Sequence, residues 1–205
     1  MSGVAPTADT ARTLTAVTAG FEIERQWRAR HDLVLPEAIG AWQAVDDGEH
    51  RLVDHYYDTA DLTLAGQRAR LRVRRTGYAE VATLKRRVPS GGRLRRRIEI
   101  EGPFDADPET SVAFVAARLL TLHPLGPIGR IVTARTTRVY ARDERTVEIA
   151  HDRVSYPVGG DEWRLEAEGR AADVREIARL LERMALGLAP VRRGKVQTLL
   201  RRCAA

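Results

Sequence analysis

Charged side chains occupy alternate positions in several stretches of this chain that otherwise have the composition of β-strands. The pattern recurs in residues 21–25, 70–75, 97–101 and 165–168, where carboxylates or guanidinium groups alternate mostly with apolar residues. Successive side chains of a strand point to opposite faces of a sheet, so each charged set lies on one face. Several strands that share this arrangement predict a sheet with one strongly charged face.

Two structures are compatible with such a face. A solvated antiparallel sheet also carries polar residues on its outer side. A sheet closed into a barrel would instead turn the charges inward, and two features favour that arrangement: the charges recur on several strands, and Thr, Ser and Lys are scarce at these positions. An interior of mixed carboxylates and guanidinium groups would bind an anion such as polyphosphate, through metal ions and cations together.

Composition narrows the class of protein. A chain of 205 residues with 43% hydrophobic residues can form one domain with a sizeable core. The net charge of +6 permits an anionic ligand. No basic run is interleaved with aromatic residues, so we expect no specific nucleic-acid partner. The single cysteine, Cys203, excludes a disulfide within the chain. Without a signal peptide or an apolar membrane span, the expected location is cytoplasmic.

Lysine is almost absent from this chain. Of 34 basic residues, only Lys85 and Lys195 are lysine. Arginine presents a planar fork of donors, whereas lysine presents a compact ammonium. The two lysines are therefore candidates for positions where a compact cation is required, although chance would explain them equally well.

The order of elements predicts an α+β fold. Strands are expected over residues 20–30, 51–57, 69–75, 80–87, 94–101, 130–141, 145–154 and 162–169. Helices are expected over residues 36–42, 60–66, 107–122, 171–186 and 191–202. Eight strands in hairpins suit an eight-stranded antiparallel β-barrel with helices packed outside. Residues 1–19 are expected to form a flexible tail, and residues 20–202 a single domain.

A series of short motifs runs along residues 21–200. They are Glu22-Ile-Glu24, Tyr56-Tyr57-Asp58-Thr59, Leu71-Arg72-Val73-Arg74, Thr83-Leu84-Lys85, Arg97-Ile-Glu99-Ile-Glu101, Glu166-Ala-Glu168 and Gly194-Lys195-Val196. Arg135, Arg138, Glu148 and Asp152 lie between the fifth and sixth motifs. This set, in this order, resembles the CYTH domain of the triphosphate tunnel metalloenzyme superfamily.

The resemblance implies a barrel that holds a triphosphate along its axis, the triphosphate tunnel. It also implies one or two Mg²⁺ or Mn²⁺ ions bound by carboxylates. Such hard cations prefer oxygen ligands and bridge substrate phosphates. Phosphoryl transfer depends mainly on positioning and electrostatic stabilisation, which this set of residues can supply.

The family's roles transfer to individual positions of this sequence. The metal ligands would be Glu22, Glu24, Asp152, Glu166 and Glu168. The phosphate-binding cations would be Arg72, Arg74, Lys85, Arg97, Arg135, Arg138 and Lys195. The side chains of Glu99, Glu101 and Glu148 would face the same interior, as metal ligands or as ion-pair partners. Structural ion pairs remain the alternative role for these carboxylates. The register leaves open whether Arg135 or Arg138 faces inward, and Asp58 is interpreted as a helix cap.

One position departs from the family pattern. Gln26 stands where the signature has a lysine, which would supply a cation near the reacting phosphate. Arg28 lies two residues further along the same face. We therefore include Arg28 with Glu22, Glu24 and Lys85 among the candidate catalytic residues.

The expected function is metal-dependent hydrolysis of a triphosphate, which could be inorganic triphosphate, a nucleoside triphosphate or thiamine triphosphate. One alternative is a class IV adenylyl cyclase that makes cyclic AMP, and another is a non-catalytic polyphosphate- or nucleotide-binding module. The expected partner is a triphosphate-containing small molecule, with no membrane partner. Monomer and homodimer both remain open.

Overall fold

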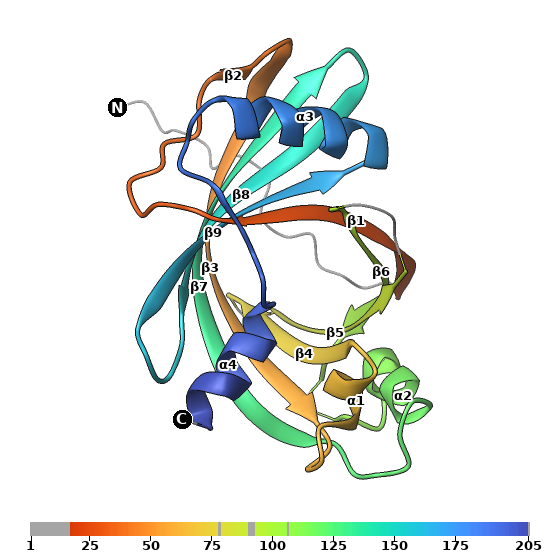
Figure 1. The fold of residues 1–205 in the computed structure, drawn as a ribbon. Helices are drawn as coiled ribbons and strands as arrows, with labels where there is room; N and C mark the ends of the chain where they lie inside the picture. Colours follow the sequence, from red (N-terminus) through yellow and green to blue (C-terminus); the bar gives the residue numbers. More distant parts are fainter. Residues whose placement is uncertain (1–16, 78, 90–92, 106, 205) are drawn as a thin grey trace, which may run out of the picture.

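The structure is a computed structural model that describes residues 17–77, 79–89, 93–105 and 107–204. Most of the expected amino-terminal tail lies outside the described residues. Eight antiparallel strands form a closed barrel in the order β1-β6-β5-β4-β3-β7-β8-β9, and β9 pairs again with β1 (Figure 1). The prediction of an eight-stranded antiparallel barrel with helices is confirmed.

The barrel strands are β1 (Thr18–Arg28), β3 (Trp42–Asp58), β4 (Ala69–Thr76), β5 (Ala79–Val88), β6 (Arg95–Pro103), β7 (Gly126–Arg142), β8 (Arg145–Ser155) and β9 (Asp161–Gly169). Two short strands are added, β2 (Ala38–Ile39) beside β3 and β10 (Ala189–Pro190) beside β1. The helices are α1 (Thr63–Gly66), α2 (Val112–Arg118), α3 (Ala171–Arg183) and α4 (Lys195–Cys203). Among the described residues, none of these helices has the length and apolarity needed to cross a membrane.

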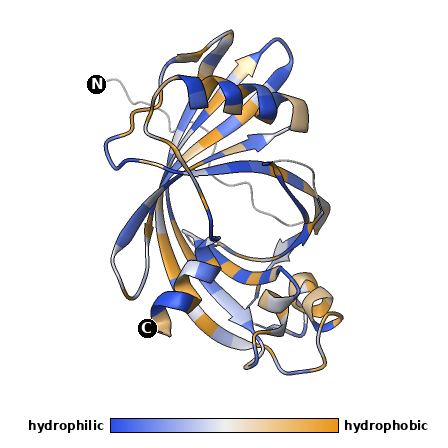
Figure 2. Ribbon diagram, viewed as in Figure 1, coloured by the Kyte–Doolittle hydropathy of each residue, from blue (hydrophilic) through white to orange (hydrophobic). Residues whose placement is uncertain are grey.

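Two apolar clusters lie outside the barrel, under the helices. Helix α3 places Ile177 and Leu181 against Trp27 of β1 and Leu165 of β9. Helix α2 packs with α1 on β4 and β5 through Phe114. Hydrophilic and hydrophobic bands alternate along several strands (Figure 2). Because these helices cover the outer face of β1, β4, β5, β6, β8 and β9, the charged positions of these strands are directed to the other face.

A third apolar cluster lies at one end of the barrel. Val196 and Leu199 of α4 pack against Tyr56, Ile131 and Val154. Val154 lies two residues from Asp152, so it shares a face with a carboxylate that the sequence places inside. Helix α4 therefore closes this end of the barrel (Figure 1), and its first residue, Lys195, pairs with Asp152 of β8 and Glu166 of β9.

Two helix predictions differ from the structure. The helix expected over residues 36–42 is wrong, because Gly40 takes a φ of 62° in a turn that joins β2 to β3. The helix expected over residues 107–122 is limited to α2, since Leu119 and Leu122 at its expected end are 84% and 102% exposed. An apolar spacing that is not buried does not stabilise a helix.

Asp58 behaves as the sequence predicts. Its carboxylate accepts hydrogen bonds from the backbone N–H groups of Leu64 (2.8 Å) and Ala65 (2.9 Å) in α1, and also from that of Thr59. These donors have no partner within the short helix itself. Asp58 therefore fixes the connection between β3 and β4.

Candidate functional site

Strand β1 lies between β6 and β9 in the barrel, so its inward side chains have neighbours on both of these strands. Glu22 and Glu24 lie opposite Arg97 and Arg95 of β6. At its other edge, β1 pairs Glu24 with Glu168 of β9. The charged positions that alternate in the sequence are thus gathered across neighbouring strands, as the period of two requires.

Glu22 is held by two cations. Its carboxylate lies 2.6 Å from the Lys85 ammonium and 3.0 Å from Nη1 of Arg97. Burial raises the pKa of Glu22, but Lys85 and Arg97 outweigh burial and bring this pKa down to about 2. The side chain is therefore a carboxylate at neutral pH.

Glu24 and Glu168 are less well compensated. Glu24 is 2% exposed, and its Oε1 forms an ion pair with Nη2 of Arg97. Burial raises the pKa of Glu24 against the effect of Arg97, and Glu166 and Glu22 raise it further. Desolvation raises the pKa of Glu168 to about 7, and Glu22 also raises it. Glu168 keeps an exposed surface, so solvent moderates this effect.

Asp152 and Glu166 form a separate group with two cations. Asp152 lies 2.7 Å from Nε of Arg135 and 2.6 Å from the ammonium of Lys195. Glu166 lies 2.9 Å from Arg135 and 3.3 Å from Lys195. Burial raises the pKa of both carboxyls, but Lys195 and Arg135 outweigh it and lower both pKa values.

The expected set of five metal ligands is therefore divided. In the part of the chain that the structure describes, no group of three or more His, Cys, Asp or Glu residues is arranged as a metal site. Asp152 and Glu166 are held by Lys195 and Arg135, and Glu22 is likewise held by Lys85 and Arg97, which disfavours a metal ion beside these three carboxylates. Glu24 and Glu168 are the two expected ligands that remain, and their oxygen donors suit a hard divalent cation. The raised pKa values of Glu24 and Glu168 fit a cation at this position.

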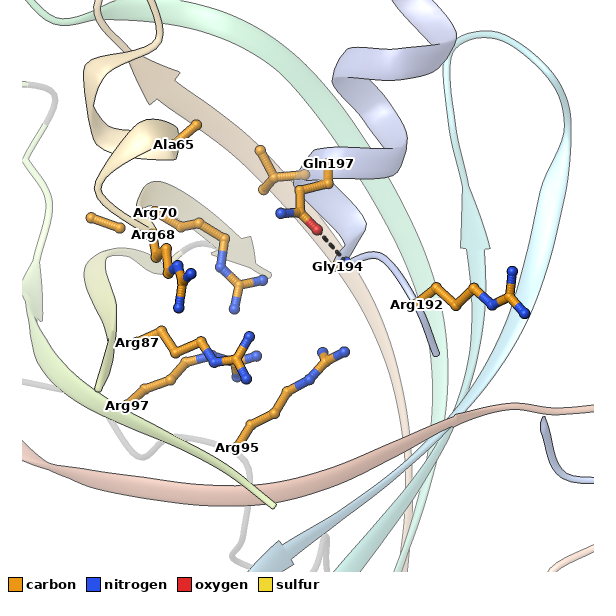
Figure 3. A pocket seen from close by; sticks show the side chains of 11 residues that line it. Ala65, Arg68, Arg70, Arg87, Arg95, Arg97, Arg192, Gly194 and Gln197 are labelled. Carbon is orange, nitrogen blue, oxygen red and sulfur yellow. Dashed lines mark hydrogen bonds between the residues drawn. The ribbon is translucent and has the colours of Figure 1, made fainter. Parts of the chain in front are cut away.

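A cavity of about 270 Å³ opens beside these carboxylates. Its lining includes Arg68, Arg70, Arg87, Arg95, Arg97 and Arg192 (Figure 3). Figure 3 shows the first five converging from β4, β5, β6 and the loop before β4. Among the described residues, no carboxylate lies within ion-pair distance of Arg68, Arg70 or Arg87. Desolvation, together with the nearby Arg97, lowers the pKa of Arg70 to about 10. A concentration of unpaired guanidinium groups of this kind binds anions.

Most of these arginines were absent from the sequence-based site. Arg87 and Arg95 lie two residues from Lys85 and Arg97, so an extension of the alternation would have found them. Arg68 and Arg192 precede their elements, where no periodic signal applies. Their positions depend on how the chain enters β4 and α4.

Arg72 and Arg74 have an internal partner that the sequence analysis missed. The carboxylate of Asp54, which is 1% exposed, lies 2.7 Å from Nε of Arg74 and 3.7 Å from Nη1 of Arg72. Asp54 occupies the position opposite Arg74 in the pairing of β3 with β4. These two arginines are thus partly neutralised within the barrel.

The remaining carboxylates of the inward face have different surroundings. Glu99 pairs with Lys85 at 3.1 Å, and Glu101 accepts a hydrogen bond from Thr83 at 2.8 Å. Glu148 lies opposite Glu168 and is exposed. The role of ion-pair partner therefore fits Glu99 best.

Arg138 corrects the sequence-based assignment. Arg135 and Arg138 are three residues apart on β7, so their side chains point to opposite faces. Arg135 is the inward one. Arg138 lies outside the barrel, where it bonds to Asp47 at 2.6 Å and to Glu37 at 2.8 Å. It therefore does not take part in an interior phosphate site.

Arg28 is also displaced from its expected position. The amide of Gln26 donates to Glu166 at 3.0 Å and accepts a hydrogen bond from Arg95. The cation beside Gln26 is thus Arg95, supplied by β6. Arg28 is exposed and lines a different cavity, together with Arg164. The prediction that Arg28 acts within the tunnel does not agree with this placement.

Comparisons with known proteins agree with the fold. A Hippeastrum protein named as an adenylyl cyclase, and described as having a dominant triphosphatase activity, has a similar structure. The two chains share 18% identity with a TM-score of 0.65, over 88% of this chain and 95% of that chain. A Bacillus halodurans protein named as an adenylate cyclase shares 21% identity with a TM-score of 0.63, over 88% and 97% of the two chains.

Identities this low establish a shared fold and no more. No curated protein matches the sequence. The CYTH domain family, however, matches residues 20–194, which is most of the chain and includes the whole barrel except the first two residues of β1. This chain therefore belongs to the CYTH domain family.

Proposed function

We propose that this protein hydrolyses the terminal phosphate of a triphosphate, with Mg²⁺ or Mn²⁺ as cofactor. The observation that carries the proposal is the division of the barrel interior. Arg68, Arg70 and Arg87 form a wall of guanidinium groups that have no carboxylate partner among the described residues. Glu24 and Glu168 form a neighbouring group with too few cations. A ligand that is anionic and carries a divalent metal would neutralise both.

Inorganic triphosphate is the substrate that this cavity suits best. Its described lining combines arginines with Ala65, Ala69, Val196 and Gln197. Guanidinium groups bind phosphate oxygens in pairs of parallel hydrogen bonds and can hold several phosphates at once. Recognition by these side chains depends on the phosphates and not on an organic group.

Glu24 and Glu168 would hold the metal, beside the ion-paired Glu22. When bound, a divalent metal neutralises phosphate charge and orients a water molecule for attack. The arginines then have two functions: they position the triphosphate along the barrel, and they stabilise the negative charge that develops on the leaving diphosphate. Lys85 keeps Glu22 ionised and correctly placed.

A second set of ion pairs supports the cavity where α4 begins. It joins Lys195 and Arg135 to Asp152 and Glu166. They fix the first residue of α4 to β8 and β9, and so hold the cavity-lining residues of α4 in place. Their proposed role is to keep the arginine wall in position before substrate arrives.

The Hippeastrum protein, described as having a dominant triphosphatase activity, supports hydrolysis as the reaction. Its name as an adenylyl cyclase keeps cyclisation as the alternative. The products distinguish the two reactions, because hydrolysis releases inorganic phosphate whereas cyclisation of ATP releases pyrophosphate and cyclic AMP.

The test is a product assay with the purified chain. Inorganic triphosphate, ATP and thiamine triphosphate are each incubated with Mg²⁺ or Mn²⁺, and phosphate and cyclic AMP are measured. We expect phosphate release, fastest with inorganic triphosphate, and at least a tenfold loss of kcat/KM for Arg70→Ala, which corresponds to about 1.4 kcal/mol. Arg175→Ala, an exposed arginine of α3, is the control. Equal activity of the two variants would exclude the cavity as the substrate site.

A further inference from the structure

A second arginine-lined cavity lies beside the segment that leads from β10 into α4. Its volume is about 690 Å³, and its lining comes from the end of β1, from β9, from residues 189–193 and from α4. The arginines that line it are Arg28, Arg164, Arg192, Arg193, Arg201 and Arg202. Of these six, only Arg192 also lines the cavity of about 270 Å³ described above, which we call the tunnel cavity.

The charges in this cavity are poorly balanced. The lining includes one carboxylate, that of Glu162, which is already ion-paired with Arg164 and accepts a hydrogen bond from the Tyr156 hydroxyl at 2.6 Å. Among the described residues, no carboxylate lies within ion-pair distance of the four arginines Arg28, Arg192, Arg193 and Arg201. The cavity therefore has a strong positive potential that an anion would relieve.

Arg164 gives this cavity a buried recognition group. Its side chain is 2% exposed, and Nη2 lies 3.3 Å from both the Tyr156 hydroxyl and Oγ1 of Thr198. Its Nη1 is buried and makes no hydrogen bond with any described residue. A buried cation is costly, and an anion in the cavity would offset the positive charge of Arg164 without contacting this atom.

We propose that this cavity is a second anion site, separate from the tunnel, and that it binds an oligophosphate. Several guanidinium groups around one cavity match a ligand with several phosphates, because each guanidinium can bind a phosphate through two parallel hydrogen bonds. The bounded volume of about 690 Å³ favours a compact ligand over nucleic acid. A nucleic-acid backbone would follow the exposed Arg193 and Arg201 without entering the cavity.

Arg192 connects the two anion sites. Figure 3 shows its side chain pointing away from the arginines that converge in the tunnel cavity. An occupant of the second cavity would therefore hold Arg192 in this orientation. The ligand in the second cavity would then fix residues 191–194 from one side, and a triphosphate in the tunnel cavity would lie on their other side.

Calorimetric titration of the whole chain with inorganic triphosphate, without divalent metal, tests the proposal. We expect two binding events in the wild-type chain. Arg28→Glu combined with Arg201→Glu should weaken one event at least tenfold and leave the other. Arg175→Glu combined with Arg179→Glu changes the net charge equally on the exposed surface of α3, and it should retain both events.

Two results would overturn the proposal. One is a titration in which the Arg28/Arg201 variant matches the α3 variant. The other is a single-stranded oligonucleotide that binds more tightly than triphosphate and is lost in the same variant. If the tunnel itself does not bind triphosphate, the wild type shows one event, which the Arg28/Arg201 variant still loses. Failure of the proposed function and failure of the second site therefore give different titrations.

Discussion

Both lysines of this chain lie inside the barrel, each between two carboxylates. Lys85 contacts Glu22 and Glu99, and Lys195 contacts Asp152 and Glu166. In each case the compact ammonium lies between two carboxylates placed diagonally on neighbouring strands. The scarcity of lysine identified both positions in the sequence. Their partners could not be predicted with it, because they depend on the register of strands far apart in the chain.

Removal of the Lys85 ammonium should destabilise the protein. Lys85→Ala leaves Glu22 with Arg97 as its remaining cation, so the pKa of Glu22 rises and the free energy of unfolding falls by about 2 kcal/mol at pH 7. Urea denaturation measures the difference. Arg86→Ala, the exposed neighbour on the outer face of β5, is the matched control and should change stability by less than about 0.5 kcal/mol. Equal losses in the two variants would show that the pairing with Glu22 contributes nothing to stability.

Arg95 and Arg138 provide a second comparison at the level of residues. Both carry the same charge, but Arg95 lines the tunnel cavity beside Gln26 and Arg138 lies outside the barrel. Arg95→Ala should weaken binding of inorganic triphosphate by about 1–3 kcal/mol, the contribution of a charge-assisted hydrogen bond. Arg138→Ala should leave the affinity within about twofold. Calorimetry that gives the reverse order would place the ligand outside the tunnel.

Helix α4 shows what can and cannot be predicted for an element. Its apolar spacing predicts a helix over residues 191–202, and the structure has one from Lys195 to Cys203. The spacing does not reveal that this apolar face closes the end of a barrel. A Cβ atom added at Gly129 of β7 would lie 2.8 Å from Cδ2 of Leu199, so the helix meets the strand backbone closely there. Only the closed sheet brings these segments together.

Leu199→Ala should therefore have a large effect. Leu199 is 0% exposed, and its truncation leaves a cavity between α4 and the barrel that costs about 3 kcal/mol of stability. Leu122, which is 102% exposed, is the control, and Leu122→Ala should cost less than about 0.5 kcal/mol. Chemical denaturation of both variants at pH 7 checks the prediction. A Leu199 variant as stable as the control would mean that α4 is not packed against the barrel.

The pairing of β3 with β4 has a pH-dependent contribution through Asp54. Burial opposes ionisation, but Arg72 and Arg74 outweigh it and hold the pKa of Asp54 well below its ordinary value. A depressed folded-state pKa stabilises the protein above the unfolded pKa of about 3.9, and this stability is lost as pH falls further. Asp54→Asn should cost about 3 kcal/mol at pH 7 and progressively less below pH 4. Denaturation curves at pH 7 and pH 3 measure the loss of unfolding free energy in Asp54→Asn relative to wild type. The same loss at both pH values would contradict the prediction.

At the scale of the whole molecule, the barrel separates its charges into zones. Paired carboxylates and cations lie where β8 and β9 meet α4, unpaired arginines lie at the tunnel cavity, and Glu24 and Glu168 lie between them. The alternation in the sequence predicts that these residues share one interior, and this part was correct. It does not predict which charges neutralise one another. That depends on the stagger of eight strands and on Asp54, whose isolated position gives no periodic signal.

Because Glu24 and Glu168 have too few cations around them, the thermal stability of the protein should depend on divalent metal even without substrate. Desolvation on folding, together with the nearby Glu22 and Glu24, raises the pKa of Glu168 from about 4.5 when unfolded to about 7 in the folded state. A raised folded-state pKa means that stability is present below the unfolded value and falls as pH rises through the folded value. Above pH 7, Glu168→Gln should therefore melt at a higher temperature than wild type in metal-free buffer.

Metal binding should reverse that order. Mn²⁺ at a hundred times its dissociation constant stabilises a protein that binds it only when folded by about 2.7 kcal/mol. The wild type at pH 8 should show this gain, and Glu168→Gln should lose most of it, because the amide oxygen carries no charge to offset that of the ion. Thermal unfolding gives the melting temperatures of wild type and Glu168→Gln, each with and without Mn²⁺. The control is Glu148→Gln, which changes an exposed carboxylate opposite Glu168. Equal metal-induced shifts in the two variants would place the metal away from Glu168, whereas the absence of a shift in wild type would remove the metal from the proposed reaction.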